Sequence, residues 1–173
     1  ATTFTSVTVA SALAGIPDPV VNDYQQSNPS FRYYLPGSQY ARHLERTFRD
    51  PLAPNLSIQQ RQVRNHWLTC HSHEVIGRFR NLAPGETDPK TRHRRLYRDR
   101  PAFTLRAGTA SRTALRPVHP VQPRVITVRE AARLHSYPDW YQFDQTKHFG
   151  YMQVGNSVCP LQAKAVFETF TSL

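Results

Sequence analysis

The sequence is short of several features that mark common classes of protein. Only two cysteines occur among its 173 residues, Cys70 and Cys159, so a disulfide framework is excluded and a reducing compartment is expected. No apolar run approaches the roughly 20 residues that span a bilayer, and we expect no membrane role. Residues 1–9 carry no basic segment ahead of an apolar run, so no signal peptide is visible. These absences together predict a cytoplasmic or otherwise intracellular protein.

Proline, by contrast, is frequent, with 14 residues spread through the whole chain. Its ring fixes φ and removes a hydrogen-bond donor, so it interrupts helices and central strands. The length allows one domain, or one modest domain with an appended lobe. We therefore predict a small, loop-rich α+β domain made of short strands and helices.

Acidic residues are few, 12 against 22 basic ones, and the excess is concentrated in one quarter of the chain. Between Lys90 and Arg133 there are twelve basic and two acidic residues, a net charge of +10, whereas the remainder of the chain is neutral. The basic residues of this block are Lys90, Arg92, Arg94, Arg95, Arg98, Arg100, Arg106, Arg112, Arg116, Arg124, Arg129 and Arg133. Such a block suits a polyanion, because each neutralised phosphate releases condensed counterions. A solvated basic face is the alternative, but a surface for solubility would be spread out and mixed in sign.

Hydrophobic periodicity predicts three helices in the first half of the chain, over residues Thr8–Gly15, Ser38–Phe48 and Ser72–Arg80. The segment Leu82–Lys90, with its central Pro-Gly turn, is interpreted as a linker. Two later segments have extended character, Leu96–Leu105 and Val121–Ile126. A small, polar stretch from Ala107 to Ser111 lies between them and is expected to be a loop.

The clearest local pattern is a helix start at Thr127. Thr127 and Glu130 form a T-x-x-E capping box, in which the hydroxyl accepts from the backbone N–H of Glu130 and the carboxylate reaches back to Thr127. Ala131 and Ala132 follow, and their small side chains let a neighbouring element approach closely. Pro138 is expected to end this helix.

The last segment is predicted to be a strongly amphipathic helix that begins at Pro160. Its apolar positions repeat at i, i+3, i+4 and i+7, at Ala163, Val166, Phe167 and Phe170. Such a stripe must be buried against something. In a chain this poor in regular elements, we expect its partner to be missing.

Two segments resemble motifs IX and X of cytosine-C5 DNA methyltransferases. The first, RVITVREAARL followed by YPD, is similar to motif IX and runs from Arg124 to Asp139. The second, QVGNSVCP, begins at Gln153 and is similar to motif X, with Ser157 and Cys159 in place of the usual alanine and proline. Weaker similarities at residues 8–17, 99–105 and 119–120 follow the family's order. The resemblance thus extends over nearly the whole chain.

The family's chemical motifs are absent from this sequence. It contains no Gly-x-Gly cofactor loop, no Pro-Cys-Gln around a nucleophile and no Glu-Asn-Val. Methylation needs a thiolate that adds to C6 of a flipped cytosine and a carboxyl group near N3. The resemblance therefore implies the target-recognition and DNA-binding part of such an enzyme, beginning about where motif VIII would end and not expected to be active alone.

The resemblance also implies partners and a division of the chain. The partners would be double-stranded DNA and a catalytic chain or domain with motifs I to VIII, which would share a site for S-adenosylmethionine, and the location would be the bacterial nucleoid. Residues 1–89 would follow the catalytic core, residues 90–123 would form the basic recognition stretch, and residues 124–173 would hold the helices of motifs IX and X. The last helix would complete an α/β methyltransferase domain. A free-standing, non-catalytic DNA-binding or regulatory protein derived from such an enzyme is the alternative.

Three sets of functional residues follow from the same resemblance and from the basic block. Those expected to contact DNA are Arg98, Arg100, Thr104, Arg106, Arg112 and Arg116. Those expected to contact the cofactor, in a tight glycine turn that could instead only cap the last helix, are Gly155, Asn156, Ser157 and Val158. Those expected to brace the recognition region structurally are Arg124, Thr127, Arg129, Glu130 and Arg133. For Arg98 and Arg100, local pairing with Asp99 is an equally good interpretation.

Four neighbouring residues invite a metal interpretation, namely His66, Cys70, His71 and His73. Their spacing fits no closed zinc site, in which four ligands usually come as two spaced pairs. We interpret them as ordinary loop and cap residues and expect no metal.

Overall fold

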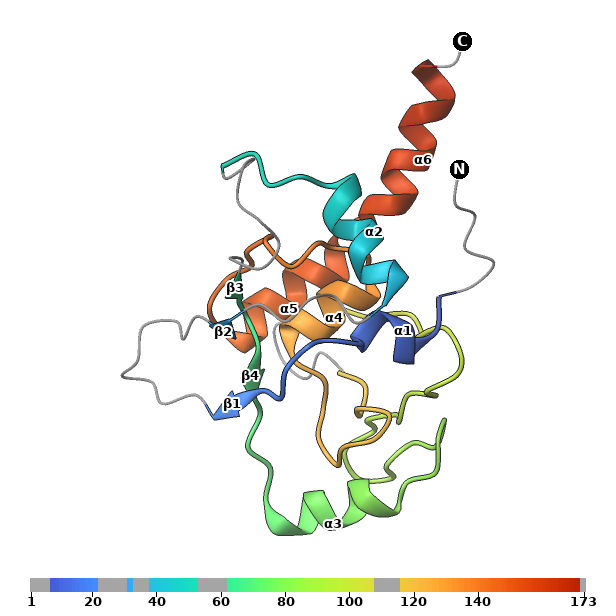
Figure 1. Cartoon of the computed structure of the whole chain (residues 1–173). Coiled ribbons are helices and arrows are strands. Elements are labelled where there is room, and N and C mark those ends of the chain that lie inside the picture. Colours follow the sequence, from blue (N-terminus) through green and yellow to red (C-terminus); the bar gives the residue numbers. More distant parts are fainter. Residues whose placement is uncertain (1–6, 22–30, 33–37, 53–61, 108–115, 172–173) are drawn as a thin grey trace.

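The computed structural model describes residues 7–21, 31–32, 38–52, 62–107 and 116–171 (Figure 1). These residues form short helices and two sheets of two strands each. The helices are α1 (Val9–Leu13), α2 (Gln39–Thr47), α3 (His73–Asn81), α4 (Val128–Leu134), α5 (Lys147–Asn156) and α6 (Pro160–Thr171). This agrees with the expectation of a small, loop-rich domain of short elements.

The strands join segments that are far apart in the sequence. Strand β1 (Val20–Val21) runs parallel to β4 (Trp67–Leu68), and β2 (Phe31–Arg32) runs antiparallel to β3 (Gln62–Val63). Each strand has only two residues, so neither sheet can carry the core. The hydrophobic core must therefore come from the helices and from the loops that pack against them.

The first three helices begin where the sequence predicts. Thr8, Ser38 and Ser72 each accept a hydrogen bond from a backbone N–H three residues further on, at 3.2, 3.1 and 3.4 Å. A side-chain oxygen at this position satisfies one of the donors that every helix start leaves free. Gly15, at a φ of 78°, follows α1 closely in a conformation that glycine adopts at low cost.

The main core lies between α1, α4 and α5, which meet near the centre of the molecule (Figure 1). Ala131 and Ala132 on α4 are fully buried, and so are Tyr151 and Val154 on α5. The small alanine side chains leave room for α5 to approach α4, as the sequence predicts. This core supports the segments that surround it.

Helix α4 ends earlier than predicted. Its last residue is Leu134, and Ser136 takes the left-handed conformation at a φ of 63°. The N–H groups of Ser136 and Tyr137 turn back to the carbonyls of Arg133 and Ala132, which is the Schellman arrangement. The chain has thus left the helix before Pro138, and the prediction that this proline ends the helix is wrong.

A second lobe contains α3 and the chain around residues 85–95 and 116–126, in the lower part of Figure 1. Phe79, Leu82, Val118 and Val125 form its small core. Residues 85–95 form a hairpin, because the N–H of Gly85 donates to Arg95 O and the N–H of Arg95 donates to Glu86 O. The interpretation of 82–90 as a linker is therefore wrong. A Pro-Gly pair marks a turn, but it does not reveal whether the flanking chain pairs with itself.

Helix α6 projects away from the rest of the molecule, and none of its residues is buried (Figure 1). Val166, Phe167 and Phe170 are 51%, 68% and 67% exposed. The predicted apolar stripe is therefore present without a partner among the described residues. No helix of the described chain is long and apolar enough to cross a membrane.

Candidate nucleic-acid interface

The tip of the hairpin is held to α3 by a buried carboxylate. Asp88 accepts hydrogen bonds from the backbone N–H and the hydroxyl of Thr91, and its other oxygen accepts from Arg78 Nε at 2.9 Å. Burial alone would raise the pKa of Asp88, but these hydrogen bonds and the charge of Arg78 lower it. The turn at the tip is therefore held in place ahead of the basic residues that follow it.

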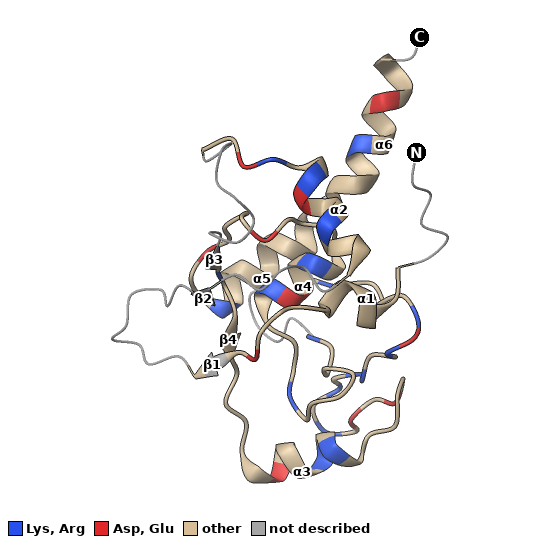
Figure 2. Ribbon diagram, in the orientation of Figure 1, with Lys and Arg blue, Asp and Glu red and all other residues tan. Residues whose placement is uncertain are grey.

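The basic block divides by burial. Its exposed members are Lys90, Arg92, Arg94, Arg98, Arg100 and Arg106. Its buried members are Arg95, Arg124, Arg129 and Arg133, and Arg116 is intermediate. Arg112 lies outside the described residues. Lys and Arg line the loops between α3 and the central helices (Figure 2). Only part of the +10 charge can thus face a polyanion directly.

Two of the exposed arginines lie on aromatic rings. The guanidinium of Arg94 is 3.9 Å from the centroid of Phe103, and that of Arg100 is 4.4 Å from the centroid of Tyr97. The two rings meet edge to face at 5.7 Å. Cation–π contacts of this kind orient a guanidinium, and that of Arg94 is fixed further because its Nε donates to Gly85 O at 2.7 Å. We call these four residues the basic-aromatic patch.

The predicted pairing of Arg98 and Arg100 with Asp99 is not among the ion pairs of the described residues; Arg100 rests on Tyr97 instead. The backbone of this turn docks on α1, because Arg98 O and Arg100 O accept from the first N–H groups of that helix, at 2.9 Å each. The two arginine side chains are exposed on the outside of the turn. Sequence patterns gave no signal for this docking.

The next segment, residues 104–107, belongs to no helix or strand, and the exposure of its side chains alternates. Leu105 is 8% exposed and belongs to the main core, whereas Thr104 and Arg106 are exposed. Both predicted DNA contacts therefore lie on the solvent side. A cavity of about 350 Å³ lies beside this segment and is lined by residues 101–105 together with Val7, Ala12, Leu134 and His135.

A half-buried pair of cations lies at the end of β4. Arg116 donates to Thr69 Oγ1 at 3.0 Å, and Lys147 donates to the carbonyl of Leu68 at 2.6 Å. Burial lowers the pKa of both groups. Burial and the nearby positive charges also lower the pKa of His71 to about 4, so its ring is neutral at pH 7. Lys147 is absent from the sequence-based prediction, because a single lysine on a helix carries no signal.

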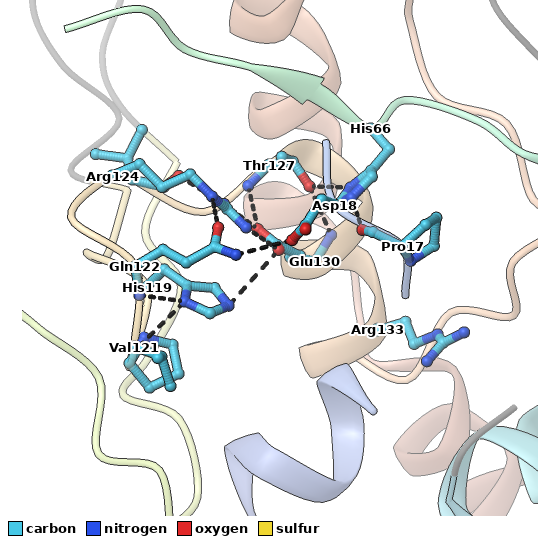
Figure 3. Close-up of polar contacts among 12 residues, drawn as sticks. Pro17, Asp18, His66, His119, Val121, Gln122, Arg124, Thr127, Glu130 and Arg133 are labelled. Carbon is cyan, nitrogen blue, oxygen red and sulfur yellow. Dashed lines mark hydrogen bonds and ion pairs between the residues drawn. The ribbon is translucent and has the colours of Figure 1, made fainter. Parts of the chain in front are cut away.

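The start of α4 is the centre of a buried network (Figure 3). Both parts of the predicted capping box are present at Thr127 and Glu130. Arg124 donates to both carboxylate oxygens of Glu130, at 2.6 and 2.8 Å. Burial would raise the pKa of Glu130, but the hydrogen bonds and charge of Arg124 outweigh it and lower the pKa to about 2. The carboxylate is therefore ionised at pH 7.

Two histidines complete this network in their neutral forms. His66 Nε2 donates to Pro17 O at 2.7 Å, so Nδ1 must accept from the hydroxyl of Thr127 at 2.8 Å. His119 Nδ1 accepts two backbone N–H groups, so its Nε2–H faces Glu130, 3.8 Å away. Burial lowers the pKa of His66, and it lowers that of His119 to about 4. The network thus ties the start of α4 to three segments that precede it in the sequence, at Pro17, at His66 and at residues 119–124.

The other two arginines of the predicted brace are bound inside the protein. Arg129 donates to three backbone carbonyls, those of Arg64, Pro138 and Tyr141. Arg133 pairs with Asp139 and also donates to Ala14 O at 2.8 Å. Burial opposes ionisation of Asp139, yet the charge and hydrogen bonds of Arg133 keep its pKa below the usual value. Each guanidinium therefore joins α4 to segments that are distant in the sequence.

The four predicted cofactor residues do not form a turn. Gly155 and Asn156 are the last two residues of α5, and Ser157 caps that helix with its hydroxyl on Val154 O at 2.7 Å. The predicted tight glycine turn is therefore wrong. Glycine disfavours helices and hides their pattern, and α5 contains both Gly150 and Gly155. Asn156 and Val158 are exposed, whereas the hydroxyl of Ser157 is already bonded within the chain.

The described residues hold no group of three or more His, Cys, Asp or Glu side chains that could bind a metal ion. Of the four residues considered for zinc, His66 is engaged with Thr127 and Pro17. Cys70 is exposed as a free thiol.

Several known proteins are similar to this chain in sequence or in structure. M.XorII, a type II methyltransferase of Xanthomonas oryzae, is 53% identical over 103 residues, which are 57% of this chain and 24% of that protein. M.AquIB, a type II methyltransferase of Picosynechococcus, is 30% identical over 129 residues, which are 64% of this chain and 89% of that protein. A solved structure described as a DNA modification methyltransferase encoded within an E. coli prophage matches 96% of this chain and 47% of its own, with a TM-score of 0.80 and 32% identity.

The chain spans only part of most of these relatives, about a quarter of M.XorII and about half of the prophage protein. The model of the family described as C-5 cytosine-specific DNA methylase matches residues 17–172, which is nearly the full sequence. The expected membership is thereby confirmed: the chain belongs to the C-5 cytosine-specific DNA methylase family.

Proposed function

We propose that this chain is the DNA-reading part of a cytosine-C5 DNA methyltransferase and that a separate catalytic part supplies the methyl-transfer groups. The observation that carries the proposal is the exposed basic surface beside the braced helix α4. The basic-aromatic patch, Thr104 and Arg106 all lie on chain that α1 and the main core support. Phosphate contacts by such groups would fix the position of the protein on DNA, and base-edge contacts would set the sequence.

The division into a DNA-reading part and a catalytic part follows from the motifs that the sequence lacks. It has neither the Pro-Cys-Gln nucleophile nor the Gly-x-Gly and Glu-Asn-Val motifs, so neither the thiolate that would attack C6 of cytosine nor the acid near N3 can be assigned to this chain. The coverage of M.AquIB supports a separate chain, because a relative exists whose length is mostly accounted for by the matched region. The catalytic part would carry motifs I to VIII.

S-adenosylmethionine would supply the methyl group when bound at the junction of the two parts. On this chain, Asn156 and Val158 would contact its edge, since both side chains are exposed at the end of α5. The hydroxyl of Ser157 and the face of Gly155 are used inside the chain. We therefore expect tight cofactor binding only when the catalytic part is present.

Methylation of duplex DNA with a labelled cofactor tests the proposal. The chain alone should transfer no methyl group, whereas the chain combined with a polypeptide carrying motifs I to VIII should methylate cytosine. Robust activity of the chain alone would refute the division of labour. A monodisperse chain that binds duplex DNA specifically and never assembles with a catalytic part would favour the alternative, a free-standing regulator.

A further inference from the structure

The last turn of α5 lies directly against the segment 104–107. A Cβ atom placed on Gly155 would be 2.6 Å from the backbone nitrogen of Ala107, 2.9 Å from its Cα and 3.1 Å from its Cβ. Contacts below 3.0 Å are essentially forbidden, and a backbone cannot swing aside as a flexible side chain can. Only glycine allows α5 to approach this segment so closely.

Helix α5 also shares a hydrophobic core with Leu105 of the same segment. Leu105 belongs to the core cluster that includes Tyr151 and Val154 on α5. Exposure alternates along the segment, with Leu105 buried and Ala107 half-buried. With Leu105 in the core and Ala107 against α5, the side chains of Thr104 and Arg106 lie on the solvent side, where both are exposed.

We propose that Gly155 is a positioning residue for DNA contact: its missing side chain lets α5 hold residues 104–107 so that Thr104 and Arg106 meet the phosphodiester backbone together. This inference rests on the proposed DNA-reading function. It gives Gly155 a role different from the one in cofactor binding that the sequence resemblance implies. The ligand chemistry is that of phosphate oxygens, which accept from the threonine hydroxyl and from the guanidinium.

The salt dependence of DNA binding reports this role better than affinity alone. Each phosphate contact contributes about 0.9 to the slope of log K against log salt concentration for duplex DNA. If Gly155→Ala displaces the segment, the guanidinium of Arg106 leaves its phosphate. The variant should bind a mixed-sequence DNA duplex several-fold more weakly, with a slope smaller by about 1. A loss of stability alone would lower the folded fraction without changing the slope.

The chain offers two matched glycine controls. In Gly150→Ala the new Cβ would lie 2.8 Å from Asp144 O and against Val128, so the variant disturbs the packing of α5 away from residues 104–107. In Gly77→Ala on α3 no atom lies within 4 Å of the new Cβ. Both controls should retain the wild-type slope, and Gly150→Ala should match Gly155→Ala in lost thermal stability.

A double-mutant cycle tests whether Gly155 acts through Arg106. Arg106→Ala should reduce the slope by about 1 in the wild type and change little in Gly155→Ala, because the contact is already lost. If Gly155→Ala does not fold, Ala107→Val crowds the same contact from the other side, because the Cβ of Ala107 faces Gly155. Ala107 is only half-buried and lies outside the core clusters, so this variant should fold and still show the smaller slope.

The two proposals fail in different ways. Absence of DNA binding by the wild-type chain would overturn the proposed function and this inference with it. Wild-type binding together with an unchanged slope in Gly155→Ala, or in Ala107→Val if the first variant does not fold, would overturn this inference alone. Equal slopes in Gly155→Ala and Gly150→Ala would also overturn it.

Discussion

The buried arginines near α4 are stable inside the protein because their donors are matched to acceptors. Arg124 meets Glu130 with two nitrogens, and Arg133 meets Asp139 and two backbone carbonyls. A charge without such partners would cost several kcal/mol to bury. Arginine residues that look alike in the sequence therefore have two roles, and only burial separates them.

Breaking one buried pair should destabilise the chain strongly. Arg133→Met would leave the carboxylate of Asp139, which is 2% exposed, without its cation. The free energy of unfolding should fall by roughly 3–5 kcal/mol, as measured by urea denaturation. Arg98→Met removes the same charge from an exposed site and should cost less than about 0.5 kcal/mol. Similar losses in the two variants would contradict the structural role of Arg133.

Acid should destabilise the protein in two successive steps. The pKa of His119 is about 4 in the folded chain, below its ordinary 6.5, so the unfolded state binds a proton first. Stability should therefore be complete above pH 6.5 and fall as the pH drops to 4, by up to about 1.4 kcal/mol per unit for each such proton. His71, with a pKa of about 4, contributes in the same range. Glu130, with a pKa of about 2 against an ordinary 4.5, adds a loss between pH 4.5 and 2. Thermal melting from pH 8 to 3 measures both.

The variant His119→Asn isolates the contribution of His119 to the first step. Its amide oxygen can still accept from the backbone N–H groups that bond to Nδ1, but it does not titrate. The decline in stability between pH 6.5 and 4 should become shallower, by an amount that corresponds to at most one bound proton. His73→Gln alters an exposed histidine and should leave the curve unchanged. An unchanged decline in His119→Asn would exclude this histidine as the cause.

At the scale of elements, helix starts are defined by local chemistry, but one of them also serves tertiary structure. The hydroxyl of Ser72 caps α3 in an exposed position. The hydroxyl of Thr127 accepts from Glu130 N–H at 3.1 Å and also donates to the buried ring of His66. Loss of the Thr127 hydroxyl would leave Nδ1 of His66 without a hydrogen-bond donor in the core.

Two cap variants should therefore differ in cost. Ser72→Ala should lower the free energy of unfolding by about 1 kcal/mol, whereas Thr127→Ala should lower it by about 2–4 kcal/mol because an unsatisfied buried group adds to the lost cap. Chemical denaturation measures both. If Thr127→Ala cost no more than Ser72→Ala, the bond to His66 would contribute nothing to stability.

The elements that the sequence predicts well are those with a local cause. Capping residues and apolar periodicity locate α1, α2, α3 and α6 to within about one or two residues. The strands have two residues each, too few for an alternating pattern, and they form because distant segments meet. Helix α5 was missed because Gly150 and Gly155 interrupt its pattern, although each glycine permits a close contact. At the candidate site, motif similarity indicated Thr104 and Arg106, but the aromatic supports of Arg94 and Arg100 depend on tertiary packing.

At the scale of the whole molecule, the surface has two features of opposite chemistry. Lys and Arg positions mark the loops near α3 (Figure 2), and several of these side chains are exposed. Helix α6, which carries exposed apolar side chains, projects from the other end of the molecule (Figure 1). Salt should affect the two in opposite directions. Contacts to phosphate weaken as ionic strength rises, while contacts between apolar surfaces are strengthened by salts such as sulfate.

The exposed face of α6 should make the isolated chain self-associate. Phe167 and Phe170 are about two-thirds exposed, and such patches seek a partner. At micromolar concentration the chain should elute from a sizing column ahead of a monomer, more so in sulfate.

The double variant Phe167→Gln/Phe170→Gln should elute as a monomer with unchanged helical circular dichroism, and it should no longer assemble with the catalytic part. Lys164→Gln/Glu168→Gln alters the polar face of the same helix and should behave like the wild type. Two results together would show that α6 is not the surface that joins the two parts: the wild type elutes as a monomer, and the wild type and the double variant assemble equally well with the catalytic part.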